Sequence, residues 1–127
     1  MPERTYTELM EAARRVREKA YAPYSHFQVG AALLSRDGRV FTGVNLENAS
    51  YPAGLCAERA ALAAAVTAGV RDFAALAVCA DGQVTPCGLC RQALAEFGDM
   101  DLLCAGTSGE PRRYRLSELL PAAFRLD

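Results

Sequence analysis

Apolar residues near the N-terminus recur with the spacing of a helix and give way to turn-forming residues near position 23. The helical spacing is carried by Leu9, Ala13, Val16 and Ala20. The segment 5–8, Thr-Tyr-Thr-Glu, has the form of a capping box. We therefore predict a helix that begins near Thr5 and ends before Pro23.

Two apolar-rich runs follow, residues 27–34 and 39–45, and the residues between them read Ser-Arg-Asp-Gly. An Asp-Gly pair between two such runs predicts a β-hairpin. Residues 47–55 are dense in turn-forming residues, which indicates a loop after the second strand.

The rest of the chain alternates between strand and helix patterns. Helices are expected at 57–68 and 88–97, each followed by a glycine, and in a short tail with Leu119, Leu120 and Phe124. Strands are expected at 73–80, 102–105 and 112–116. The first of these strands is almost wholly apolar, which is typical of a strand buried on both faces. The element order predicts an α/β fold: one domain over residues 1–127, a three-layer α/β/α sandwich with a mixed central sheet.

Composition narrows the function classes. The chain has 127 residues and a formal net charge of −1, and no run of Lys or Arg exceeds two residues. A protein that holds long nucleic acid usually carries a basic stripe, so we expect no nucleic-acid partner. No segment resembles a signal peptide or is long enough to span a bilayer, so we expect no membrane partner and a cytoplasmic location. There, the five cysteines are expected to be metal ligands, catalytic groups or buried thiols rather than disulfides.

Three cysteines stand where predicted helices begin. Cys56 precedes the helix at 57–68, and Cys87 and Cys90 open the next helix as a Cys-x-x-Cys pair. Free amide groups and the helix dipole at such a position favour thiolate over thiol. Three thiolates can hold one Zn²⁺ per chain and leave a fourth position open, as in catalytic zinc sites.

Two charged residues follow Cys56 within one helical turn. A carboxylate such as Glu58 beside a catalytic zinc can take a proton from water and pass it to a substrate atom. Arg59 stands three residues after Cys56 and so projects from the same helix face. Because three thiolates and one Zn²⁺ sum formally to −1, we expect Arg59 to draw thiolate charge away from the metal.

Other interpretations stay open at this point. A Cys-x-x-Cys pair alone is more often redox-active or structural than catalytic, and a structural-zinc interaction module would need a fourth thiolate. Cys79 and Cys104 could supply it, but both lie in apolar strands, where a free cysteine packs as a small hydrophobe. His26 follows Pro-Tyr-Ser in a turn and is expected at the surface.

The motifs together resemble those of the small, homotetrameric cytidine deaminases that act on free nucleosides. They are Pro-Tyr-Ser-His-Phe at 23–27, Val-Gly-Ala-Ala-Leu at 29–33, Asn-Leu-Glu-Asn-Ala-Ser-Tyr at 45–51, Cys-Ala-Glu at 56–58 and Pro-Cys-Gly-Leu-Cys-Arg-Gln at 86–92. The resemblance runs from about residue 5 to Phe124. At His26 many members of the family carry lysine.

The resemblance implies a role for each matching residue. Cys56, Cys87 and Cys90 would be the zinc ligands and Glu58 the proton shuttle. Substrate would be bound by Asn45 and Glu47 at the ribose hydroxyls, by Phe27 at the pyrimidine, and by the backbone of Ala57 at the base. Tyr51 and Phe124 would lie near a subunit boundary and complete a neighbouring site.

The implied reaction is hydrolytic attack at C4 of cytosine in free cytidine or deoxycytidine, which yields uridine or deoxyuridine and ammonia. Glu58 would protonate N3 and then the departing amino group. The implied partners are a small nucleoside substrate and further copies of the chain, most simply a homotetramer. A modified nucleoside or a pyrimidine antibiotic stays open as an alternative substrate, because near-neutral charge argues only against a polynucleotide.

Overall fold

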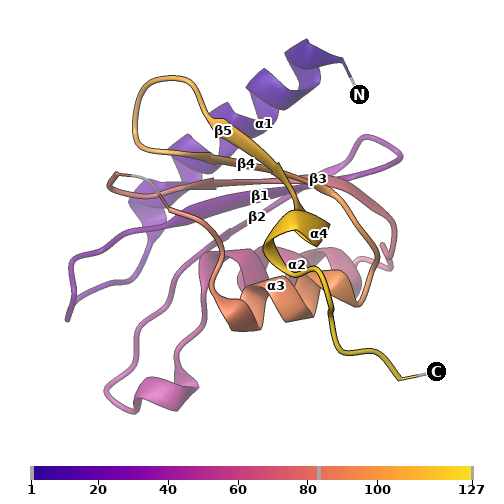
Figure 1. The fold of residues 1–127 in the computed structure, drawn as a ribbon. Helices are drawn as coiled ribbons and strands as arrows, with labels where there is room; N and C mark the ends of the chain where they lie inside the picture. Colours follow the sequence, from indigo (N-terminus) through magenta and orange to yellow (C-terminus); the bar gives the residue numbers. More distant parts are fainter. Residues whose placement is uncertain (1, 83, 127) are drawn as a thin grey trace.

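The computed structural model describes residues 2–82 and 84–126, and its centre is a mixed five-stranded sheet (Figure 1). The strands are β1 (Gly30–Ser35), β2 (Val40–Val44), β3 (Phe73–Cys79), β4 (Asp101–Ala105) and β5 (Arg112–Arg115). Their order across the sheet is β2-β1-β3-β4-β5. Only the β3–β4 pair is parallel among these neighbours.

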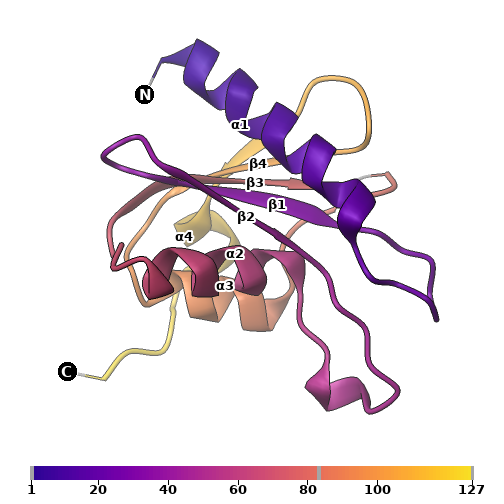
Figure 2. The ribbon, with the colours of Figure 1, turned by 180° about the vertical axis from the view of Figure 1, so that it is seen from behind.

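Helices cover both faces of the sheet, which confirms the predicted three-layer α/β/α sandwich. One face packs against α1 (Glu3–Val16), and the other against α2 (Ala57–Thr67), α3 (Gly88–Ala95) and α4 (Leu116–Leu119). Figure 2 shows the same layers from behind. Two short 3₁₀ turns, Arg17–Lys19 and Tyr51–Ala53, follow α1 and precede α2. Within the residues described, every helix is too short or too polar to cross a membrane.

Strand β3 is buried along its whole length, as the sequence predicts. Successive side chains point to opposite faces, so Leu76 and Val78 enter the core under α2 and α3, whereas Ala75 and Ala77 pack under α1. Small residues on the α1 side let this helix lie close to the sheet.

The two remaining cysteines are core residues, as expected. Cys79 packs on the α1 side and Cys104 on the opposite side. Burial raises the pKa of the Cys79 thiol, and it raises the pKa of the Cys104 thiol to about 12. Both therefore stay protonated at neutral pH and make poor metal ligands.

Helix α2 lies directly against the backbone of β2 at Gly43. A Cβ atom at this position would stand 2.4 Å from the amide nitrogen of Ala61 and 2.6 Å from the carbonyl oxygen of Ala57. Gly43 therefore lets the first turns of α2 sit on the hairpin. Because Cys56 and Glu58 belong to that end of α2, this contact places them relative to the sheet.

Two predicted element starts are wrong. Helix α1 begins at Glu3 after Pro2, without a side-chain cap, so the predicted capping box at 5–8 is already inside the helix. There the Thr7 hydroxyl bonds back to the carbonyl of Glu3. Strand β1 begins at Gly30 rather than at residue 27.

The C-terminal prediction is also wrong in part. The strand β5 ends at Arg115, and α4 is one turn that stops at Leu119, so Phe124 lies beyond any helix. Pro121 limits the length of α4, because it lacks the amide hydrogen that a continuing helix would need.

Candidate metal centre and active site

Three cysteine sulfurs converge where α2 and α3 begin. Cys56 is the N-cap of α2, Cys87 is the N-cap of α3, and Cys90 lies in the first turn of α3. The Cys87 sulfur lies 3.9 Å from that of Cys56 and 3.6 Å from that of Cys90, and all three lie within 4.8 Å of one another. Ligands on a tetrahedral zinc at about 2.3 Å stand roughly 3.8 Å apart, so this donor set fits the metal.

Electrostatics also favour a cation at this cluster. Hydrogen bonding from the Cys90 thiol, with help from Arg59 and Cys87, lowers the pKa of the Cys56 thiol to about 5. The bond with Cys56 and burial raise the pKa of the Cys90 thiol. A thiol in this cluster therefore favours the thiolate form of its neighbour, and a bound cation would favour thiolates in the same way.

Arg59 contacts the cluster as the sequence predicts. Its Nη2 atom donates a hydrogen bond of 3.5 Å to the Cys56 sulfur. The bonds to Cys56 and Cys90 raise the pKa of Arg59, so it stays charged. Its Nε atom is buried and, within the described part of the chain, has no hydrogen-bond partner. The orientation of this guanidinium is therefore set by the thiolates.

Glu58 is a buried carboxyl group in the first turn of α2. Only 5 % of its surface is exposed. Burial raises the pKa of the Glu58 carboxyl, and the negative charge of Cys56 acts in the same direction. A buried carboxyl group whose pKa is raised in this way is suited to take up and release a proton, which general acid–base chemistry requires. Ala57, beside it, is the first residue of α2, and its amide has no partner within the helix.

Asn45 and Phe27 are joined by hydrogen bonds. The side-chain amide of Asn45 donates to the Phe27 carbonyl at 2.8 Å, and its oxygen accepts the Val29 amide at 2.9 Å. These bonds use the backbone of residues 27–29 and explain why β1 begins only at Gly30. Phe27 keeps 41 % of its surface exposed, so its ring is free to contact another molecule.

Glu47 is held by the turn that precedes Phe27. Its Oε1 atom accepts the amides of Tyr24 at 2.9 Å and Ser25 at 3.1 Å, and its Oε2 atom accepts the Ser25 hydroxyl. The bond from Ser25 is the main cause that lowers the pKa of the Glu47 carboxyl. Ser25 also accepts the Phe27 amide. Sequence reasoning missed Tyr24 and Ser25, although the turn-forming Pro-Tyr-Ser motif was a signal.

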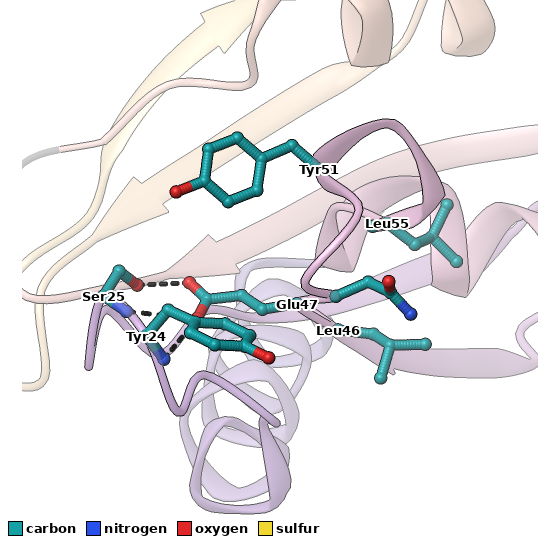
Figure 3. A pocket seen from close by; sticks show the side chains of 8 residues that line it. Tyr24, Ser25, Leu46, Glu47, Tyr51 and Leu55 are labelled. Carbon is teal, nitrogen blue, oxygen red and sulfur yellow. Dashed lines mark hydrogen bonds between the residues drawn. The ribbon is translucent and has the colours of Figure 1, made fainter.

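A pocket of about 370 Å³ opens between this turn and the loop before α2 (Figure 3). Its lining is Tyr24, Ser25, Leu46, Glu47, Asn48, Tyr51, Gly54 and Leu55. Leu55 is followed directly by Cys56, so the pocket wall leads into the cysteine cluster. The Tyr51 ring stands over this opening with 83 % of its surface exposed.

Phe124 lies apart from that opening, on the C-terminal segment beside α3. It is 69 % exposed, and the Gln92 side chain bonds both its amide and its carbonyl group. The structure thus joins Phe27, Asn45 and Glu47 in one network and Cys56, Glu58 and Arg59 in one helical turn. It leaves Tyr51 and Phe124 at the surface.

Comparison with known proteins agrees with this geometry. Residues 3–106 match the family model described as "Cytidine and deoxycytidylate deaminase zinc-binding region". The chain is 48 % identical over 120 residues to a cytidine deaminase of Sporosarcina psychrophila, covering 91 % of this chain and 88 % of the relative. It is 46 % identical over 130 residues to the cytidine deaminase of Mycobacterium tuberculosis, covering 100 % and 95 %.

Solved structures show the same likeness. The crystal structure of cytidine deaminase from Burkholderia pseudomallei superposes with a TM-score of 0.90 at 48 % identity, over 98 % of this chain and 100 % of that one. The cytidine deaminase structure from Mycobacterium tuberculosis gives a TM-score of 0.80 at 40 % identity, over 95 % and 98 %.

Proposed function

Because the chain belongs to the cytidine and deoxycytidylate deaminase family, we propose that it hydrolyses free cytidine and deoxycytidine to uridine and deoxyuridine, with release of ammonia. The observation that carries this proposal is the buried Glu58 beside a cluster of three cysteine sulfurs. In the reaction, a C–O bond first forms at C4 of the base, and the C4–N bond to the amino group then breaks.

Cys56, Cys87 and Cys90 are the residues that hold zinc in this proposal. A zinc ion with three protein ligands lowers the pKa of a water molecule from about 15.7 to about 7 and so supplies a nucleophile at neutral pH. Arg59 donates a hydrogen bond to the Cys56 sulfur, and by drawing charge from it would keep a bound zinc a stronger Lewis acid.

Glu58 moves the protons. Its raised pKa allows the carboxylate to accept a proton from water and the carboxylic acid to donate it to N3 of the base. A second transfer moves the proton of the new C4 hydroxyl to the amino group, which leaves as ammonia while C4 becomes a carbonyl carbon. Burial favours both steps, because few water molecules compete for the carboxyl group.

The nucleoside is bound by the network that joins residues 24–29 to 45–47. Glu47 is an ionised, acceptor-only group and suits the hydroxyl donors of a sugar. Asn45 binds the sugar beside it and, through Phe27 and Val29, fixes the segment that carries the aromatic ring. The Phe27 ring then packs on the pyrimidine, and the free amide of Ala57 contacts the base.

The active form is a homotetramer of single-domain chains in this proposal, and its location is the cytoplasm. The support is the exposure of large apolar side chains, among them Tyr51 and Phe124, which a lone chain would leave in water. All five cysteines are free thiols, in keeping with a reducing compartment.

The proposal is tested by measuring zinc content and then following cytidine, deoxycytidine and CMP by ultraviolet absorbance. We expect one zinc per chain and turnover of both nucleosides. A zinc-loaded protein that leaves cytidine and deoxycytidine unchanged would overturn the proposed activity. A fourth thiolate on the metal would instead support a structural-zinc module.

A further inference from the structure

Arg91 follows Cys90 directly in α3, and its guanidinium makes three hydrogen bonds to three different residues. The Nε atom donates to the Pro86 carbonyl at 2.7 Å. The Nη1 atom donates to the Leu119 carbonyl at 2.9 Å, and Nη2 donates to the Thr85 hydroxyl at 3.1 Å. This side chain therefore bridges α3, the segment before α3, and the end of α4, which lies beside α3 in Figure 1.

The acceptors of Arg91 lie next to a zinc ligand. The Pro86 carbonyl belongs to the peptide group that leads into Cys87, and Thr85 is one residue further upstream. Pro86 is buried, so its carbonyl would have little access to water if Arg91 were lost. The bonds to Thr85 and Pro86 thus fix the orientation in which the chain reaches Cys87.

Geometry rather than charge explains why an arginine is needed. The guanidinium is planar and offers five N–H donors in fixed directions, so it can bind three acceptors at once. A lysine ammonium group is a single point of charge on a flexible stem. Lysine at this position would keep the charge but could not bridge the same three groups.

We propose that Arg91 is a positioning residue for the zinc ligands, which keeps Cys87 and Cys90 at their spacing of 3.6 Å. The inference rests on the proposed zinc-dependent function. Helix α2, which begins after Cys56, needs no such bridge, because its first turns already pack directly on the β-hairpin at Gly43. Cys87 is exposed and follows an irregular segment, so its place depends on Arg91.

The neighbouring Gln92 provides a matched control. Its side chain bonds Phe124 at 2.9 and 3.2 Å and so holds the C-terminal segment, but it does not bond residues 85–87. A variant at Gln92 therefore disturbs α3 and the C-terminal segment but leaves the bonds from Arg91 to Thr85 and Pro86 in place.

The experiment measures the rate at which the zinc-loaded protein loses its metal to a chromogenic chelator, in the parent, Arg91→Lys and Gln92→Ala. Loss of groups that orient metal ligands typically costs 10–100-fold in metal affinity, so we expect Arg91→Lys to release zinc ~10–100-fold faster. Gln92→Ala should release it at the parental rate. The cobalt-substituted Arg91→Lys protein should also show an altered visible spectrum, which reports the geometry at the metal.

Thr85→Val serves as a milder variant in case Arg91→Lys does not fold, because it removes one acceptor and keeps the side-chain shape. We expect a few-fold faster release. Parental release rates in Arg91→Lys or in Thr85→Val, or equal acceleration in Gln92→Ala, would overturn the proposal. A parent that binds zinc without deaminating cytidine would refute the proposed activity and leave this inference standing, whereas a parent that takes up no zinc would refute both.

Discussion

At the scale of single residues, the Glu58 carboxyl lies where two effects favour its protonated form. Burial is the larger effect, and the charge on Cys56 adds to it. Glu47 has the opposite environment, since three donors from Tyr24 and Ser25 favour its ionised form. Two carboxyl groups of one site are thus separated in pKa by their surroundings. This separation supports the proposed roles, which are proton transfer for Glu58 and sugar binding for Glu47.

The first prediction concerns Glu58→Gln. Glutamine keeps the size of the side chain but cannot transfer a proton, and general acid–base catalysis contributes ~10²–10⁴-fold. Because Glu58 serves more than one transfer in the proposed mechanism, we expect turnover of cytidine to fall by at least that factor, with zinc content and thermal unfolding unchanged. The control is Glu96→Gln at the exposed end of α3. Near-parental turnover in Glu58→Gln would contradict the mechanism.

The second prediction concerns the charge of Glu47 and its effect on a substrate phosphate. A phosphate on the sugar would approach an ionised carboxylate, and the sequence from Asn45 to Tyr51 contains no Arg or Lys to offset it. We expect kcat/KM for CMP to be lower than for cytidine by roughly a hundredfold or more. Glu47→Gln should lower cytidine turnover and bring the kcat/KM values for CMP and cytidine closer together.

The matched control for Glu47 is Ser25→Ala. It removes the hydroxyl that holds Oε2 but leaves the carboxylate and the two amide bonds. This variant should raise KM for both substrates by a similar factor and leave their ratio unchanged. Comparable kcat/KM values for CMP and cytidine in the parent would show that the charge of Glu47 does not select the substrate.

At the scale of elements, local pattern was sufficient for the buried strands and for the helix starts that carry the metal ligands. Strand β3 and helix α2 were predicted almost to the residue, because apolar runs and alanine propensity are local properties. The same holds for the positions of Cys56, Cys87 and Cys90 at the starts of α2 and α3, because each cysteine belongs to a short motif.

What the sequence did not predict depends on bonds between distant residues. Strand β1 starts late because Asn45 binds residues 27 and 29, which lie up to 18 positions away. Arg91 reaches Leu119 across 28 positions, and Ser25 reaches Glu47 across 22. No periodicity records such pairs, so Ser25 and the bridging role of Arg91 emerged only from the structure.

The third prediction concerns the bond between α1 and β4. The Tyr6 hydroxyl donates to Asp101 at 2.6 Å, which needs a neutral tyrosine and is strongest when the aspartate is ionised. Burial and this bond raise the pKa of Tyr6 to about 12. Burial alone would raise the pKa of Asp101, but the bonds from Tyr6 and Arg115 outweigh it and lower that pKa.

The sign of the pH dependence follows from these directions. A lowered carboxyl pKa stabilises the fold above its unfolded value of about 3.9, and the gain is lost as the pH falls through the folded value. Tyr6→Phe should therefore lower the free energy of unfolding at pH 7, with a difference that shrinks below about pH 4. Urea unfolding of both proteins across this range measures it. A difference that stays constant with pH would exclude the Tyr6–Asp101 bond as its cause.

At the scale of the whole molecule, the pocket is an open surface feature of the single chain. Its rim carries exposed aromatic groups, Tyr24 and Tyr51, and Phe124 projects from the C-terminal segment that Gln92 holds on α3. An exposed aromatic ring on a segment held by two hydrogen bonds offers apolar surface to a second chain, which is the role that the proposed tetramer gives to Phe124. Helix α3 thus holds two segments through neighbouring side chains. Arg91 bonds residues 85 and 86, which lead into Cys87, and Gln92 bonds the candidate interface residue Phe124.

The last prediction is that four chains assemble and that assembly completes the sites. Light scattering should give the mass of a tetramer for the parent. Phe124→Ser should shift the protein toward smaller species and lower kcat/KM for cytidine in parallel, because the partner's side chain closes the open pocket. The control is Val40→Thr, which replaces an exposed apolar side chain on β2 by one of the same shape. This variant should stay tetrameric and active. If Phe124→Ser dissociates to a monomer that keeps parental kcat/KM, each chain contains a complete site, and the exposed rings serve assembly alone.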